Sequence, residues 1–217
     1  LIGYALTMLL TFPLFQTMAD AANPALSRAT ETNPVTLTLP ECEFSVFAQK
    51  QATECGKALS FLSKRGITHT KQTGESVLMQ VGGISVTGFD EKAYVSALES
   101  AGYADKSDPA ERKPWLIVLC VALLVGLSAM TYGQVAAILV ELFPARIRYT
   151  SMSIPYHIGT GYFGGFLPLI SGVIVARTGD PYSGLWYTWV VTAVALLVAW
   201  WGLKGGPPRD FEEANPA

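Results

Sequence analysis

Residues 115–166 read WLIVLCVALLVGLSAMTYGQVAAILVELFPARIRYTSMSIPYHIGTGYFGGF, and this stretch decides the fold. Charged side chains are absent from residues 114–140 and 149–176, and a further uncharged block covers residues 181–203. Each block is long enough to cross a hydrocarbon core of about 30 Å as a helix that rises about 1.5 Å per residue. The sequence therefore predicts an integral membrane protein.

The chain begins inside another apolar run, LIGYALTMLLTFPLFQTMADAA, at residues 1–22. We expect a fourth membrane helix over residues 1–18. A secretory signal peptide is the alternative, because MADAA at the end of the run imitates a cleavage site, although no basic residues precede the apolar part. The first residue is Leu1 rather than Met, so we expect this chain to be the C-terminal part of a longer one.

A polar insert separates this first helix from the others. Residues 19–113 contain 10 of the 15 basic residues and 12 of the 17 acidic residues. Its edges are rich in Pro, Ser, Ala and charge, which predicts linkers. Between them, apolar periodicity predicts a small α+β domain with a thin core. Its predicted elements are strands at 35–39, 44–48 and 67–70, a hairpin or a bulged strand around Gly82-Gly83, and helices at 51–64 and 90–101.

The overall prediction is an all-α polytopic membrane protein that carries this α+β insert. Basic residues in short loops favour the cytoplasmic side. They concentrate in the loop at 144–150 and in the tail at 204–217, so we expect both to be cytoplasmic and the insert to be extracytoplasmic. The predicted membrane helices cover residues 1–18, 114–143, 151–176 and 184–203.

Two cysteines lie within the insert. Cys42 and Cys55 flank the start of the helix predicted at 51–64. A disulfide between them would stabilise so small a core by roughly 3 kcal/mol in an oxidising compartment. The alternatives are two free thiols, or a metal pair with His69, but the sequence lacks metal-ligand spacing. We therefore expect a disulfide, no metal and no cofactor.

The sequence excludes several function classes. A net charge of −2 without a basic stripe offers no surface for nucleic acid. Nucleophile elbows, HExxH motifs and phosphate loops are all absent, so we expect no enzyme. Polar groups at membrane depth tend to face a bundle interior or a wet cavity. Five of them are candidates for a substrate cavity or for proton coupling: Tyr132, Gln134, Tyr156, His157 and Tyr162.

His157 has two possible roles. It is either a proton-linked group or an ordinary hydrogen-bonded histidine at a helix interface. Glu141 lies at the C-terminal end of its predicted helix, where the helix dipole disfavours a carboxylate, so it needs a basic partner. Arg146 and Arg148 are the nearest bases. The three residues would form either a surface ion pair or a gate network that breaks when the protein changes conformation.

Small residues line the helix that contains His157. Gly161 and Gly165 form a small-xxx-small pair, which lets another helix approach closely. We expect these two glycines to pack against a neighbouring helix, as a static contact.

The residues around this pair carry a family resemblance. Tyr132-Gly133, VELFPARIRYTSMS at 140–153 and PYHIGTGYFGGFLP at 155–168 resemble the metabolite:proton symporters of the major facilitator superfamily. In that family the E-x-F-P-x-R-x-R loop joins helices ten and eleven. The resemblance implies that the four predicted membrane helices are helices nine to twelve. Gln134 departs from the pattern, which has proline there.

The resemblance implies a function as well as a fold. It implies a secondary transporter in the bacterial inner membrane that carries a small polar metabolite together with protons by alternating access. Its partners would be the metabolite, protons, the lipid bilayer and the N-terminal helices of the same transporter. The alternatives are a membrane-anchored binding or sensor protein that acts through the insert, and a truncated gene product without function.

Overall fold

A computed structural model of the chain describes residues 1–41, 48, 51–104, 107–144 and 146–202. Three predictions fall wholly or largely outside this range: Cys42, most of the strand at 44–48, and the tail at 204–217. Within it, four helical stretches are long and apolar enough to cross a membrane, so the chain is an integral membrane protein. They cover Ile2–Ala22, Pro114–Leu142, Arg148–Thr178 and Pro181–Gly202.

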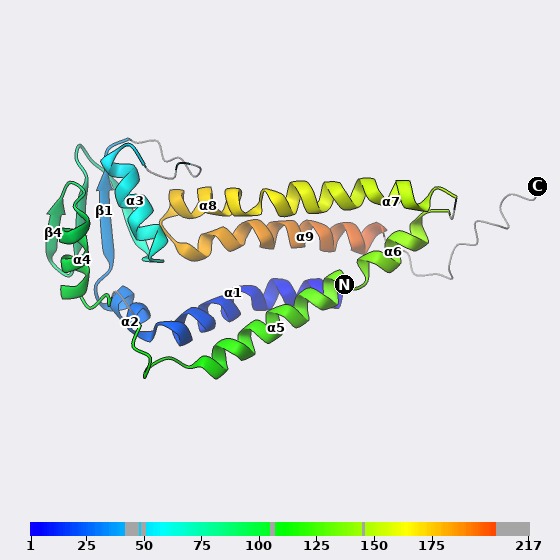
Figure 1. Ribbon diagram of the computed structural model, residues 1–217, viewed down its shortest axis with the longest axis horizontal. Helices are drawn as coiled ribbons and strands as arrows, with labels where there is room; N and C mark the ends of the chain where they lie inside the picture. Colours follow the sequence, from blue (N-terminus) through cyan, green and yellow to red (C-terminus); the bar gives the residue numbers. More distant parts are fainter. Residues whose placement is uncertain (42–47, 49–50, 105–106, 145, 203–217) are drawn as a thin grey trace, which may run out of the picture.

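The long helices run side by side away from the insert (Figure 1). Helix α1 (Ile2–Ala22) packs against α5 (Pro114–Tyr132) and α9 (Leu185–Gly202). The indole Nε1 of Trp189 on α9 donates a hydrogen bond to the Met8 carbonyl on α1, at 3.2 Å. Helix α8 (Leu167–Thr178) joins α9 through a short 3-10 helix, η2 (Pro181–Gly184).

Two of the four spans are interrupted. The second span breaks at Gly133-Gln134, so α5 ends at Tyr132 and α6 covers Val135–Leu142. The third span is made of α7 (Arg148–His157), a π-helix η1 (Ile158–Gly164) and then α8. Interruptions of this kind in membrane helices occur where the backbone lines a cavity or is held by protein neighbours.

The insert is built on a four-stranded sheet with the order β2-β1-β3-β4. β1 (Val35–Leu39) pairs in parallel with β2 (His69–Thr73), and α3 (Glu54–Lys64) makes the crossover between them. β3 (Leu78–Val81) pairs antiparallel with β1 and with β4 (Ile84–Thr87). The predicted turn joins β3 to β4, and Gly82 and Gly83 there adopt φ of 55° and 82°.

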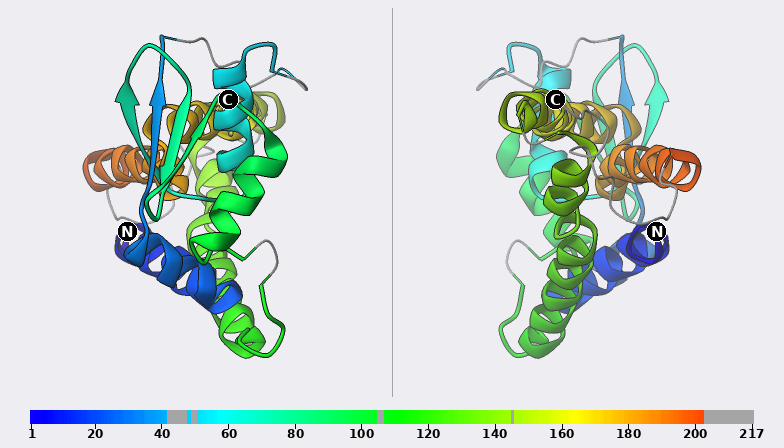
Figure 2. Two further views of the ribbon diagram at one scale, coloured as in Figure 1. Left: turned by 90° about the vertical axis from the view of Figure 1, so that its left-hand side faces the viewer. Right: turned by 90° about the vertical axis from the view of Figure 1, so that its right-hand side faces the viewer.

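One face of the sheet carries the core of the insert. α3 and α4 (Glu91–Ser100) lie on the same side of the sheet (Figure 2). Leu37 in the central strand, Met79 in β3 and Tyr94 in α4 have 0 % of their surface exposed. This alternation of buried and half-exposed residues along β1 is typical of a sheet that is covered on one face.

The structure corrects the prediction that a linker follows the first helix. α1 continues to Ala22 rather than ending at residue 18, and α2 (Pro24–Thr32) follows at once. The Asn23 side chain accepts a hydrogen bond from the Leu26 amide at 3.2 Å, and Pro24 occupies the first turn of α2. Asn and Pro are helix-start residues as well as loop residues, which is why composition alone suggested a linker.

Both ends of the insert meet at the same point. The Ser107 hydroxyl donates to the Ala22 carbonyl at 2.7 Å, and the Lys113 amide donates to the Ala21 carbonyl at 3.0 Å. Arg28 and Glu111 form an exposed ion pair at 2.7 Å. The end of α1 and the start of α5 are therefore joined at the base of the insert.

A second point of attachment joins β2 to the turn between α8 and η2. The His69 amide donates to the Gly179 carbonyl at 3.0 Å, and the Lys71 ammonium donates to the Ala176 carbonyl. His69 is 4 % exposed, and its Nδ1 lies 3.0 Å from the Ile67 carbonyl. Because a carbonyl only accepts hydrogen bonds, the neutral ring carries its proton on Nδ1, and Nε2 has no hydrogen-bond partner among the described residues. Burial lowers the pKa of His69.

Candidate substrate cavity between two interrupted helices

A cavity of about 480 Å³ lies where the second and third spans meet. Each span contributes a stripe of residues with the spacing i, i+3, i+4, i+7, which places the stripe on one helix face. The stripe on the second span begins at the end of α5, crosses the break and continues along α6. The stripe on the third span lies on α7. The two stripes are Tyr132, Val135, Ala136 and Leu139, and Tyr149, Met152, Ser153 and Tyr156, with His157 beside the second.

Two tyrosine hydroxyls meet across this cavity. The oxygens of Tyr132 and Tyr156 are 2.7 Å apart, which is a hydrogen bond in which either group can donate. Both rings are partly open to the surroundings, with exposed fractions of 54 % and 43 %. One phenolic proton of the pair occupies the shared bond and the other is available to a ligand. The rest of the lining is largely apolar, as is usual for small-molecule sites with a few polar groups.

His157 lies next to this pair, at the end of α7. Its ring is 5.9 Å from the Tyr156 ring, centroid to centroid, with an interplanar angle of 78°. The π-helix begins at the following residue, and the Thr160 hydroxyl donates to the Tyr156 carbonyl at 2.8 Å. The structure therefore brings three of the five candidate residues, Tyr132, Tyr156 and His157, into one cavity.

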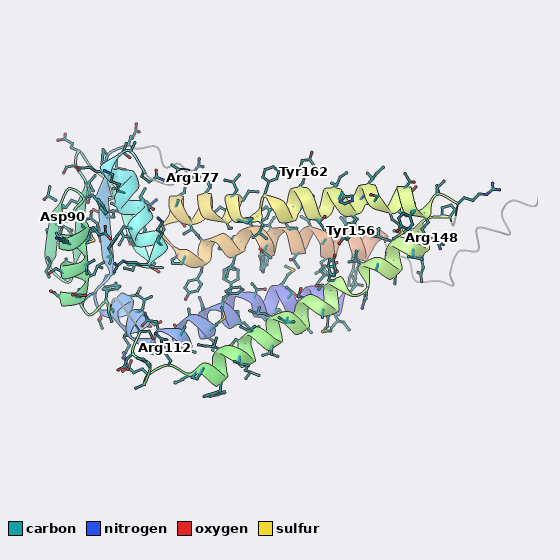
Figure 3. The ribbon with its side chains drawn as sticks, in the orientation of Figure 1. Asp90, Arg112, Arg148, Tyr156, Tyr162 and Arg177 are labelled. Carbon is teal, nitrogen blue, oxygen red and sulfur yellow. The ribbon has the colours of Figure 1, made fainter. Side chains whose placement is uncertain are left out.

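The other two candidates lie outside the lining. Gln134 forms the break between α5 and α6, but its side chain is not part of the cavity wall. Tyr162 lies on the π-helix, 64 % exposed, with its ring 6.1 Å from that of Phe166. Figure 3 shows Tyr162 on the outer side of the third span, away from Tyr156.

The residues proposed for a gate lie at the end of the bundle far from the insert. Glu141 and Arg146 are exposed. The Arg148 Nε donates to the Phe143 carbonyl at 3.2 Å (Figure 3). Among the described residues, no ion pair joins Glu141 to either arginine. The gate network stays a prediction.

The glycine pair on the third span faces open space. A Cβ added at Gly161 or at Gly165 would meet no described atom within 4 Å. No part of the third span's most apolar window is buried in the described structure. Packing at these glycines stays a prediction, and so does the Cys42–Cys55 disulfide, because Cys42 lies outside the described residues. Cys55 itself is buried at the start of α3.

Sequence reasoning missed several residues of the cavity wall. Tyr149, Met152 and Ser153 were not among the candidates, although they share a helical stripe with Tyr156. Their spacing is visible in the sequence, but only the pairing with the second span distinguishes it from a lipid-facing stripe.

Comparisons with known proteins identify relatives of the chain. No family model and no solved structure matches it. A citrate-proton symporter of Klebsiella pneumoniae is 34% identical over 92 residues, 42% of this chain and 20% of that protein. The inner membrane metabolite transport protein YhjE of Escherichia coli is 34% identical over 86 residues, 38% of this chain and 20% of that protein.

A third relative gives the same result. A protein named as a proline/betaine transporter of Staphylococcus aureus is 27% identical over 112 residues, 48% of this chain and 24% of that protein. The matched part thus spans about a quarter or less of the length of each of these relatives. The names of these relatives agree with the resemblance of the chain to the metabolite:proton symporters of the major facilitator superfamily.

Proposed function

We propose that the chain forms the last four membrane helices of a proton-coupled symporter for a small polar metabolite, either an organic acid or a zwitterion. In the major facilitator fold, two six-helix halves rock about a site near the middle of the membrane. The observation that carries the proposal is the cavity in which Tyr132, Tyr156 and His157 meet at two interrupted spans.

The cavity suits a carboxylate. Two of the relatives are named for proline and betaine and for citrate, each of which carries at least one carboxylate. Tyr132 and Tyr156 can donate hydrogen bonds to a carboxylate, and the apolar side chains of Val135, Leu139 and Met152 line the wall beside them. His157, whose ring lies beside that of Tyr156, is the residue that we propose as the proton-linked group of the symport.

The proposed orientation places the insert outside the cell and the loop at 144–150 in the cytoplasm of a bacterium. Two observations support it. Arg146 and Arg148 concentrate positive charge in that short loop. The insert and the loop also lie at opposite ends of the long helices (Figure 1).

The N-terminal helices of the same transporter are the proposed partners of the exposed third span. The rival function, a membrane-anchored binding or sensor protein, is less well supported, because all three relatives are named as transporters. None of these names describes an enzyme.

Uptake measurements test the proposal. The complete transporter, reconstituted in proteoliposomes, should accumulate labelled proline, betaine or citrate when an inward proton gradient is imposed. Collapse of the gradient with a protonophore should abolish accumulation. Substrate binding without any gradient-dependent accumulation would favour the binding or sensor function instead.

The cavity is tested by removal of one hydroxyl. We expect Tyr132→Phe to raise the KM for uptake by roughly 3- to 10-fold, because a lost hydrogen bond costs about 0.5–1.5 kcal/mol. Tyr162→Phe is the matched control, since this hydroxyl lies on the other side of the third span. Equal kinetics in the two variants would remove Tyr132 from the site.

A second variant tests the gate. We expect Glu141→Ala to lower the maximal uptake rate while membrane insertion stays intact, because the carboxylate would pair with Arg146 or Arg148 in another conformation of the transporter. Glu99→Ala, an exposed acid on α4 of the insert, is the control. If Glu141→Ala transports at the rate of this control, the gate hypothesis is wrong.

A further inference from the structure

A second cavity, of about 530 Å³, lies between the insert and the membrane helices. α3 contributes one wall, and α8, η2 and the start of α9 contribute the other. The insert is polar, whereas α8 and α9 belong to membrane spans. The cavity therefore lies at the boundary between the hydrocarbon layer and the water on the insert side.

The two walls differ in chemistry. The membrane wall is mainly apolar, with Leu167, Val175 and Leu185 among its side chains, and it also contains Ser171 and Thr188. The α3 wall is polar and contains Ser60, Ser63 and Lys64. A ligand that satisfies both walls has a polar head and an apolar tail. The described lining of this cavity shares no residue with that of the cavity near Tyr132, so the two are separate sites.

Two polar groups of the α3 wall lack partners among the described residues. The Ser63 hydroxyl is shielded from solvent and makes no hydrogen bond, although buried hydroxyls nearly always do. Lys64 is exposed and makes no ion pair within the described part of the chain. Both are therefore available to a ligand that brings hydrogen-bond acceptors.

The charged side chain of the described lining is basic. Among the described residues, the lining contains Lys64 and no carboxylate. Arg177, which follows the lining residue Ala176, is exposed at the α3 end of α8 (Figure 3). The acid of the adjoining turn, Asp180, accepts a hydrogen bond from the Tyr182 amide at 3.0 Å and caps η2. An anionic head group complements this arrangement.

We propose that the cavity between α3 and the α8–α9 hairpin binds an anionic phospholipid of the leaflet on the insert side. The phosphate would lie against Lys64 and the Ser63 hydroxyl, and the first part of an acyl chain would lie along Leu167, Val175 and Leu185. The volume is within the range of about 300–1,000 Å³ that is usual for ligand sites. This inference does not depend on the transported substrate.

Photo-crosslinking in nanodiscs tests the proposal. The probe is a photoreactive phosphatidylglycerol diluted into phosphatidylcholine, with crosslinked peptides mapped by mass spectrometry. We expect crosslinks in residues 60–64 and 167–188. Lys64→Gln should reduce this labelling about fivefold, since one basic residue near an anionic membrane surface is worth about 1 kcal/mol. Lys57→Gln, an exposed lysine of α3 outside the cavity, should leave it unchanged.

A variant whose side chain fills the cavity tests the crosslinking result independently. Ser60→Trp should reduce labelling even with Lys64 present, because the indole occupies the space of the lipid. Equal labelling of wild type, Lys64→Gln and Ser60→Trp would overturn the proposal. The proposal would also fail if a photoreactive phosphatidylcholine labels these peptides as strongly as the phosphatidylglycerol does. It would fail, too, if soluble glycerol phosphate competes as well as the lipid does, since a free anion would then be the ligand.

Discussion

Replacement of Gly179 with alanine is expected to release the insert from the turn between α8 and η2, at a cost of about 2–4 kcal/mol. Two effects add. Gly179 has φ of 79°, a conformation that residues with a Cβ rarely adopt. A Cβ at this position would also collide with the His69 carbonyl oxygen, which belongs to the backbone and cannot rotate away. The hydrogen bond between the His69 amide and the Gly179 carbonyl would then be lost.

Amide hydrogen exchange at His69 measures this release. We expect its protection factor to fall by more than about 30-fold in Gly179→Ala, since 1.4 kcal/mol corresponds to a factor of ten. Gly66→Ala is a matched control, because Gly66 has φ of 66° but no atom within 4 Å of the added Cβ. It carries the backbone strain without the collision. Equal loss of protection at His69 in both variants would show that the close contact does not hold the insert.

Acidification should weaken the same attachment. His69 has a lowered pKa, mainly because it is buried, and Lys71 contributes to the shift while the bond to the Ile67 carbonyl opposes it. When the insert is released from the turn between α8 and η2, His69 has the ordinary pKa of about 6.5. The released form then binds a proton that the docked form, in which His69 is buried against this turn, excludes. The docking free energy is thus constant above pH 6.5. It falls by up to about 1.4 kcal/mol per pH unit below that, until the pKa of the docked form is reached.

Protection factors at the His69 and Lys71 amides, measured between pH 8 and pH 5, test this dependence, because they are corrected for the intrinsic effect of pH on exchange. A flat profile in the wild type would contradict the prediction. His69→Asn should give a flat profile, since its amide group can still donate to the Ile67 carbonyl but does not titrate.

Local patterns predicted much of the insert. The alternation in residues 35–39 predicted a strand with the bounds that are observed. Gly82-Gly83 predicted a hairpin or a bulged strand, and the structure has the hairpin, in which both glycines adopt positive φ between β3 and β4. Asp90 was predicted to begin a helix, and its carboxylate accepts a hydrogen bond from the Lys92 amide at 3.0 Å. These features depend on a few consecutive residues, so the sequence alone contains them.

Long-range contacts could not be predicted in the same way. The bond between His69 and Gly179 joins backbone atoms of residues 110 positions apart, and backbone groups have no side-chain pattern. The pairing of Tyr132 with Tyr156 depends on how two spans cross, although each tyrosine was a candidate by itself. The π-helix at Ile158–Gly164 was also missed, because its glycines read equally well as a packing stripe.

The attachments of the insert imply that stiffness changes along the membrane normal. At the insert end, hydrogen bonds tie the end of α1 to the start of α5, and β2 to the turn before α9. At the far end, two hydrogen bonds among the described residues link the second and third spans: the Tyr132–Tyr156 bridge, close to the break in one span and the π-helix in the other, and the bond from Arg148 to the Phe143 carbonyl. The helix ends near the insert are thus held more firmly than the ends near the loop at 144–150. A rocking motion would have its largest amplitude at the loop ends.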